Sequence, residues 1–332
     1  MAQQARALWL CRPGVAEIRT EQLPDRGAGE VLVRTVCSGV SRGTEALVFR
    51  GGVPASQREL MRAPYQVGDF PGPVKYGYLN VGVVEEGPRQ LRGRTVFCLY
   101  PHQTAYVVPA SAVTVLPDAV PATRAVLAGT LETAVNAVWD AAPLLGERVA
   151  VVGAGMVGCC VARLMSRVAG VRVILVDTDP TRAAVAEALG VEFAAPVDAP
   201  RGVDLVVHTS ATSAGLQLSL DLLAPEGEVV DLSWYGDAPT TVALGGSFHS
   251  GRLALRSSQV GTVAPRRRGR RTPAERMALA VELLDDPALD VLVTCSSRFA
   301  DLPDAMARLA SGDLPAICHT VDYSEESSTC TP

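Results

Sequence analysis

The sequence is nearly devoid of lysine, asparagine and isoleucine. Of the 30 basic residues only Lys75 is a lysine, asparagine occurs at two positions, and isoleucine occurs at three. These residue types share AT-rich codons, so a GC-rich genome is the simplest explanation of their scarcity. Under such a bias surface lysines are replaced by arginine, and the lysine that remains is a candidate for a role that arginine cannot fill.

A surplus of basic residues and a long apolar run are also missing. The formal net charge is −5, whereas a general nucleic-acid binder needs a basic surplus to displace counterions. No run reaches the roughly 18–20 apolar residues of a membrane span, and the opening MAQQARALWLCRPG lacks the apolar core of a signal peptide. We therefore expect a cytoplasmic protein that acts on a small molecule, without nucleic-acid or membrane partners.

The eight cysteines form no CxxC pair and show no metal-ligand spacing. Their scatter is typical of reduced thiols in a cytosolic protein. The C-terminal SEESSTCTP, which contains Cys330, is polar and lacks a core pattern, so we expect it to be frayed.

The first 120 residues have the pattern of a β-rich domain. Short β-branched runs are separated by Gly and Pro, as in a barrel or sandwich. These runs are Val31–Val36, Val81–Glu85, Thr95–Leu99 and Ala105–Val108. From Thr123 to Ala141 the chain is alanine-rich with helical spacing, which predicts a connecting helix.

From Glu147 onward, predicted strands and helices alternate. Continuous Val/Ile/Leu runs separated by helices indicate a parallel sheet covered on both faces, and hence an α/β fold. The predicted strands are RVAVVGAG, VRVILVD, VDLVVHTS, GEVVDLS and LALRSSQV, and the predicted helices are Met156–Val168, Thr181–Leu189, Leu216–Leu223 and Pro273–Leu284.

One motif in this second half carries chemistry. Gly153-Ala154-Gly155-Met156-Val157-Gly158 is a GxGxxG sequence that follows a buried strand and opens a helix. The first glycine allows a tight turn, the second lets backbone approach a pyrophosphate, and the third lets the helix pack on the strand. The helix N-terminus offers N–H groups and a positive dipole end to the phosphates. The alternative is a glycine turn without a nucleotide.

An acidic residue completes the motif. Asp177 ends the next strand, 19 residues after Gly158, where a carboxylate can hold a ribose diol. A carboxylate there repels a 2′-phosphate, so NAD is favoured over NADP, while Arg182 lies near enough in sequence to weaken that preference. We place three hydroxyl residues that close the later strands in the same predicted cofactor set: Thr209, Ser210 and Ser233.

In the order and spacing of these parts, the chain resembles the medium-chain dehydrogenase/reductase family. A β-rich, GroES-like part precedes the dinucleotide-binding part, and a helix leads into GERVAVVGAGMVG. The resemblance covers nearly the whole chain. It implies a GroES-like catalytic domain (1–122 and 291–332), a Rossmann domain with a doubly wound parallel sheet (123–290), and a cofactor cleft between the two. It also implies a homodimer or homotetramer.

The zinc ligands of that family are not matched. The family's SGxCGTD segment is here Ser38-Gly39-Val40-Ser41-Arg42-Gly43-Thr44-Glu45, its Gly-His-Glu is Gly77-Tyr78-Leu79, and its third ligand falls at about Ala128. The lobe that carries structural zinc is missing. Two hydroxyls and an alanine make no tetrahedral zinc site, so we predict a zinc-free member. The SGxSxGTE motif is similar to that of the branch containing bacteriochlorophyllide dehydrogenase.

Without zinc, another group must transfer the proton. Lys75 and Tyr78 lie around the lost histidine position, and an ammonium near a phenol lowers its pKa and makes it an acid–base group. The resemblance assigns proton relay to the hydroxyl at Thr44, beside Glu45, and Glu132 lies on the connecting helix near the third ligand position. The alternatives are a surface lysine, packed tyrosines and solvated carboxylates.

Other polar residues rank lower. His102 and His249 are candidates for lining the cleft, and His208, inside a buried strand, is expected to be a satisfied core group. The arginine run within 266–271 is either a solvated loop or a capture site for an anionic substrate.

The leading functional hypothesis is a zinc-independent, NAD(H)-dependent oxidoreductase. It transfers hydride between nicotinamide and a secondary alcohol or ketone of a small substrate, such as a polyol or specialised metabolite. Three alternatives stay open: a quinone- or enone-type C=C reductase, a redox-neutral enzyme with tightly bound NAD, and a nucleotide-sensing protein on a dehydrogenase scaffold.

Overall fold

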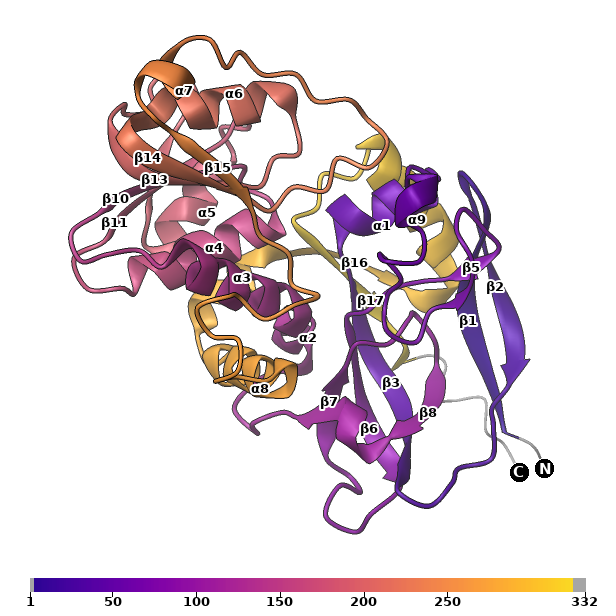
Figure 1. Ribbon diagram of the computed structural model, residues 1–332. Helices are drawn as coiled ribbons and strands as arrows, with labels where there is room; N and C mark the ends of the chain where they lie inside the picture. The colour runs from indigo at the N-terminus through magenta and orange to yellow at the C-terminus, as the bar shows by residue number, and fades with distance from the viewer. Residues whose placement is uncertain (1–2, 325–332) are drawn as a thin grey trace. The chain divides into compact units, whose positions relative to one another are not determined.

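The computed structural model describes residues 3–324, and the chain divides into two units (Figure 1). The first unit runs to Gly129 and resumes at Val293, and the second is Thr130–Leu292. These boundaries lie a few residues after the predicted ones at 122/123 and 290/291. The predicted helix 123–141 is two helices, α2 (Ala122–Ala125) and α3 (Ala128–Ala141). The boundary between Gly129 and Thr130 falls in the first turn of α3.

The first unit is built on two sheets. The smaller has the strand order β2-β1-β5-β4, and the larger has the order β16-β17-β3-β6-β7-β9, with β8 also paired to β3. The strands of the smaller sheet are β1 (Gln4–Arg12), β2 (Val15–Gln22), β4 (Val67–Gly68) and β5 (Val74–Lys75). Those of the larger sheet are β3 (Glu30–Val40), β6 (Asn80–Glu86), β7 (Thr95–Cys98), β8 (Ala105–Pro109), β9 (Val113–Val115), β16 (Val293–Arg298) and β17 (Cys318–Asp322).

Alternating side chains explain the long central strand β3. Val31 and Val33 are fully buried and pack with Val84 and Val96 from neighbouring strands, and Tyr106 stacks on Tyr100 with ring centroids 3.9 Å apart. The C-terminal segment returns to this sheet, where β17 pairs antiparallel with β3. Two helices of this unit pack on each other, α1 (Arg42–Phe49) and α9 (Leu302–Ser311).

The second unit contains the predicted parallel sheet, with the order β12-β11-β10-β13-β14-β15. The order reverses direction at β10 and β13, which is the doubly wound arrangement whose ligands bind at the carboxyl ends of the strands. The strands are β10 (Arg148–Val152), β11 (Arg172–Val176), β12 (Glu192–Ala194), β13 (Val203–His208), β14 (Leu223–Asp231) and β15 (Ala254–Ser257). The predicted α/β fold class is thereby confirmed.

Helices cover both faces of this sheet (Figure 1). The helices of this unit are α3, α4 (Met156–Ser166), α5 (Arg182–Leu189), α6 (Ser213–Leu222), α7 (Ser247–Ser250) and α8 (Pro273–Leu283). Local chemistry sets their ends: α8 begins with a capping box between Thr272 and Glu275, the Thr212 hydroxyl caps α6, and α5 ends at Gly190, whose φ is 70°.

Within residues 3–324, no helix is long and apolar enough to cross a bilayer. The described cysteines are free thiols, most of them buried, as expected. The segment predicted to be frayed is outside the described residues from Glu325 onward, and this part includes Cys330.

Candidate functional site

The glycine-rich turn lies at the carboxyl end of β10, where the sheet order reverses. Gly153 has a φ of +110°, and a Cβ there would come within 2.8 Å of the Ser210 nitrogen. A Cβ on Gly158 would come within 1.9 Å of the Gly153 carbonyl oxygen, whereas one on Gly155 would meet no atom within 4 Å. The first and third glycines are therefore required by packing, while the second leaves open space at the start of α4, beside Met156 and Val157.

Asp177 holds this turn from the neighbouring strand end. One carboxylate oxygen accepts a hydrogen bond from the Ala154 N–H at 2.6 Å, and the other accepts one from the Asp179 N–H at 2.9 Å. Arg182 pairs with Asp179 at 3.2 Å. Each oxygen of Asp177 keeps a second lone pair, and its side chain is partly exposed.

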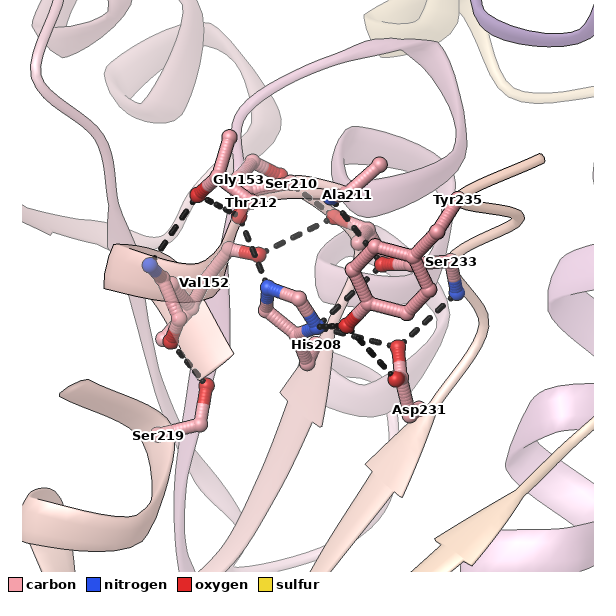
Figure 2. Close-up of polar contacts among 12 residues, drawn as sticks. Val152, Gly153, His208, Ser210, Ala211, Thr212, Ser219, Asp231, Ser233 and Tyr235 are labelled. Carbon is pink, nitrogen blue, oxygen red and sulfur yellow. Dashed lines mark hydrogen bonds and ion pairs between the residues drawn. The ribbon is translucent and has the colours of Figure 1, made fainter. Parts of the chain in front are cut away.

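The residues after β13 and β14 meet the same turn. The Thr209 hydroxyl donates to the Gly153 carbonyl oxygen at 2.8 Å. The Ser233 hydroxyl accepts the Ala211 N–H at 3.0 Å. The structure thus gathers the hydroxyl residues of the predicted cofactor set around the carboxyl edge of β10, β13 and β14, where Figure 2 shows Ser210 and Ser233.

His208 is buried and hydrogen-bonded on both ring nitrogens, as expected of a satisfied core group, but it also belongs to this edge. Its Nδ1 lies 2.9 Å from an Asp231 carboxylate oxygen, and its Nε2 lies 2.7 Å from the Ser210 hydroxyl (Figure 2). The Tyr235 hydroxyl donates to the other oxygen of Asp231 at 2.9 Å. The two strand ends are in register, His208 beside Asp231, so these side chains lie on one edge.

These contacts determine which form of Asp231 is stable. Burial acts to raise the pKa of Asp231, but hydrogen bonds from His208, the Ser233 N–H and Tyr235, together with electrostatic attraction to the His208 ring, lower it overall. The pKa of Tyr235 is raised, first by burial and then by the neighbouring carboxylate charge. Asp231 is therefore ionised and Tyr235 is protonated at neutral pH.

A second polar cluster lies inside the first unit. Glu45 is in the first turn of α1, and one of its carboxylate oxygens accepts the Ser41 N–H at 2.8 Å. The other oxygen lies 2.8 Å from His102 Nε2, and His102 Nδ1 lies 2.7 Å from the Ser38 hydroxyl. Ser38 in turn lies 3.0 Å from the Tyr323 hydroxyl.

Tyr78 lies beside this cluster. Burial, and then the charge of Glu45, raises the pKa of Tyr78 to about 12, although hydrogen bonds with the Ser41 and Thr44 hydroxyls act in the opposite direction. Three of the predicted proton-transfer residues, Thr44, Glu45 and Tyr78, are therefore gathered at one place.

Lys75 has other partners. Its ammonium lies 2.7 Å from the Glu21 carboxylate and donates to the Gln103 side-chain oxygen at 2.7 Å, and it is only 4% exposed. The prediction that this ammonium lowers the pKa of Tyr78 is wrong, because burial and Glu45 raise it. The surface-lysine alternative is also wrong.

Glu132 lies in the second unit, on α3. It is 5% exposed and pairs with Arg276 of α8 at 3.0 Å, and Arg276 also donates to the Asn136 side-chain oxygen at 2.6 Å. Burial raises the pKa of Glu132, and the charge of and hydrogen bond from Arg276 oppose the rise. The ion pair joins two helices of one unit, so neither a catalytic nor a solvated carboxylate is needed to explain this residue.

The remaining residues that the sequence analysis singled out lie at different places and differ in exposure. His249 is exposed on α7, and His102 is buried. The arginine run lies on an exposed loop, where Arg267 stacks over Trp139 at 5.9 Å. Sequence reasoning missed His319, which is 2% exposed and has an unpaired Nδ1; burial, then the charges of His102 and Arg308, lowers its pKa to about 4.

The side chains present do not fit zinc. Ser41 and Tyr78, at two predicted ligand positions, are hydrogen-bonded hydroxyls, and Ala128, at the third, has no donor atom. Among the residues that the structure describes, no group of three His, Cys, Asp or Glu side chains could hold a metal ion.

Comparisons with known proteins agree with this architecture. A family profile described as zinc-binding dehydrogenase matches residues 180–314, a segment that contains neither the glycine-rich turn nor Ser41 and Tyr78. No curated protein sequence matches the chain. The fold shared with the solved structures described next confirms the predicted α/β architecture.

Solved structures share the fold over nearly the whole chain. An alcohol dehydrogenase from E. coli CFT073 complexed with NADH is 18% identical, with a TM-score of 0.76, covering 96% of this chain and 99% of that one. L-idonate 5-dehydrogenase from E. coli K-12 is 16% identical, with a TM-score of 0.78 and coverages of 97% and 99%. A zinc-binding dehydrogenase from Sinorhizobium meliloti 1021 bound to NADP is 18% identical, with a TM-score of 0.76 and coverages of 97% and 100%.

Proposed function

We propose that the protein is a zinc-independent, NAD(H)-dependent oxidoreductase that interconverts a secondary alcohol and a ketone. The observation that carries the proposal is the open space at Gly155, at the start of α4, between two glycines that packing requires. A helix N-terminus with no side chain in front of it is suited to a pyrophosphate. The matched dehydrogenase profile and the nicotinamide cofactors of two fold relatives support the same conclusion.

The residues of the carboxyl edge would hold a dinucleotide. Gly155 and the first N–H groups of α4, from Met156 and Val157, would receive the pyrophosphate, and Asp177 would accept from the ribose hydroxyls. A nicotinamide ring bound there supplies hydride transfer. Because Asp177 is a carboxylate and Arg182 is paired with Asp179, NAD is preferred to NADP.

Tyr78 is the proton donor in this proposal. Its raised pKa keeps the hydroxyl protonated at neutral and mildly alkaline pH, so it can donate to a ketone oxygen as hydride reaches the carbon. The hydroxyls of Ser41 and Thr44 fix its direction, and Glu45 disfavours the phenolate.

Changing Asp177 to Asn is expected to lower the preference for NADH over NADPH about tenfold, or ~1.4 kcal/mol. The amide keeps an acceptor for the Ala154 N–H but removes the charge that repels a 2′-phosphate. Fluorescence titration with each cofactor measures the ratio, and Asp198→Asn, an exposed carboxylate on the same unit, is the control. An unchanged ratio contradicts the NAD preference, and a wild-type protein that binds neither cofactor contradicts the proposal.

Tyr78→Phe is expected to reduce the rate of NADH-dependent ketone reduction about 100-fold without changing NADH affinity. A panel of small ketones and enones, followed by NADH absorbance, provides the measurement. Tyr76→Phe is the matched control, because Tyr76 packs edge-on against Tyr78 with ring centroids 6.0 Å apart. Equal rates in Tyr78→Phe and wild type would exclude Tyr78 as the donor, and turnover of enones alone would indicate C=C reduction instead.

A further inference from the structure

The hydroxyl of Ser210 lies in a hydrogen-bonded chain that runs from Asp231 through His208 to Ser210 and on to the Thr212 hydroxyl, 3.0 Å from Ser210 Oγ. Asp231 contacts His208 Nδ1 at 2.9 Å, and His208 Nε2 contacts Ser210 Oγ at 2.7 Å (Figure 2). A carboxylate on one ring nitrogen and a hydroxyl on the other is the connectivity in which a histidine takes a proton from a nucleophilic serine.

The ionised state of Asp231 determines which ring nitrogen of His208 carries the proton. An ionised carboxylate only accepts hydrogen bonds, so the proton shared with Asp231 resides on His208 Nδ1. In the neutral imidazole, Nε2 is then the free base that faces Ser210. Asp231 accepts hydrogen bonds from the Tyr235 hydroxyl at 2.9 Å and from the Ser233 N–H at 2.9 Å. These bonds hold the carboxylate in place, and the carboxylate in turn orients the His208 ring.

The backbone presents Ser210 at a sharp turn from strand to helix. It lies between β13 and α6, next to Ala211, whose φ of 53° is rare for a residue with a side chain. The first turn of α6 packs against the hydroxyl, since a Cβ on Gly215 would come within 2.1 Å of Ser210 Oγ. The Gly215 N–H in the first turn of α6 donates to the Thr212 hydroxyl at 3.0 Å, and the N–H groups that precede it in that turn would favour negative charge, as an oxyanion requires.

Exposure to solvent distinguishes these hydrogen-bonded side chains from a similar set in the first unit. Glu45, His102 and Ser38 have the same kind of connectivity, but each is only 1% exposed. Ser210 is partly exposed, at the edge of the sheet. Only the Ser210 chain can therefore meet a substrate without a change in the fold.

We propose that Ser210 is a nucleophile with a second, esterase-type activity toward carboxylic esters with small acyl groups. Ser210 Oγ forms a bond to the carbonyl carbon while its proton passes to His208 Nε2. The bond from that carbon to the alcohol oxygen breaks, and Nε2 returns the proton to the leaving alcohol. Water then attacks the acyl-serine with the same proton transfers, so that ester and water give acid and alcohol. The tight packing at Gly215 restricts the acyl group to a small one.

The test uses a fluorophosphonate probe and p-nitrophenyl acetate on the full chain. We expect one label per chain on Ser210 and a stoichiometric burst of p-nitrophenolate. Ser210→Ala is expected to lower both at least about 100-fold, while Ser213→Ala, which changes a serine outside the chain of contacts, leaves them unchanged. An unlabelled wild type, or equal labelling in Ser210→Ala, would overturn the proposal.

A second variant keeps the three side chains and changes their geometry. Gly215→Ala places a Cβ within 2.1 Å of Ser210 Oγ and 3.0 Å from His208 Nε2, so the hydroxyl must rotate away from Nε2, while alanine suits a helix. Labelling should fall to the level of Ser210→Ala with the thermal transition retained, and full labelling would contradict the proposed geometry. Asp177→Ala separates this proposal from the oxidoreductase, because it should weaken NADH binding and leave labelling intact.

Discussion

Gly158→Ala is expected to lower the free energy of unfolding by about 3 kcal/mol or more. The added Cβ would lie 1.9 Å from the Gly153 carbonyl oxygen, which is backbone and cannot rotate aside. Gly153 is itself held by two hydrogen bonds, from its N–H to the Val176 carbonyl oxygen at 2.8 Å and from the Thr209 hydroxyl to its carbonyl oxygen at 2.8 Å. Urea unfolding followed by circular dichroism measures the loss.

Gly155→Ala is the matched control for this packing effect. Its Cβ would enter open space, so we expect stability within about 0.5 kcal/mol of wild type. The same methyl group would occupy the space proposed for a pyrophosphate, and NADH affinity should fall about tenfold. If Gly155→Ala binds NADH as well as wild type, the proposed phosphate position is wrong. A Gly158→Ala protein as stable as wild type would contradict the close approach of this position to the Gly153 carbonyl oxygen.

Arg276→Met is expected to destabilise the second unit by about 3–5 kcal/mol. The substitution leaves the Glu132 carboxylate buried without its cation, and it also removes donors to the Asn136 side chain and to the Val260 carbonyl oxygen. Chemical denaturation of the intact protein measures the loss.

The double variant Glu132→Leu/Arg276→Met tests the cause. If the uncompensated charge dominates, removing both partners should recover part of the stability lost in Arg276→Met. A double variant no more stable than Arg276→Met would assign the loss to the unpaired carbonyl and amide groups instead. An Arg276→Met protein within 1 kcal/mol of wild type would restore Glu132 as a candidate for proton transfer.

Local rules were sufficient to predict the glycine-rich turn and its contact with Asp177. The GxGxxG spacing, the buried strand before it and Asp177 after it are close in sequence, and the structure brings them into direct contact. The parallel sheet was also predictable, because its strands are continuous apolar runs. The three-residue edge strand β12 was missed, since Glu192–Ala194 is too short to show a periodicity.

Contacts between distant segments were not predictable. The scarcity of lysine drew attention to Lys75, but its partners Glu21 and Gln103 lie 54 and 28 residues away, and nothing local encodes the pairing. The ends of β13 and β14 offered a better indication. His208 and Asp231 each lie near the end of a predicted parallel strand, so their meeting at one edge follows from the topology, although sequence reasoning placed His208 in the core alone.

The buried ion pair of Lys75 has a practical consequence for measuring conformational opening. A lysine-specific protease has one cleavage site in this chain, after Lys75, and that side chain is inaccessible while the smaller sheet of the first unit is intact. Cleavage therefore requires opening of that sheet, and its rate follows the population of the open state when closing is fast. The two fragments on a gel would report the opening equilibrium of the first unit without any added label.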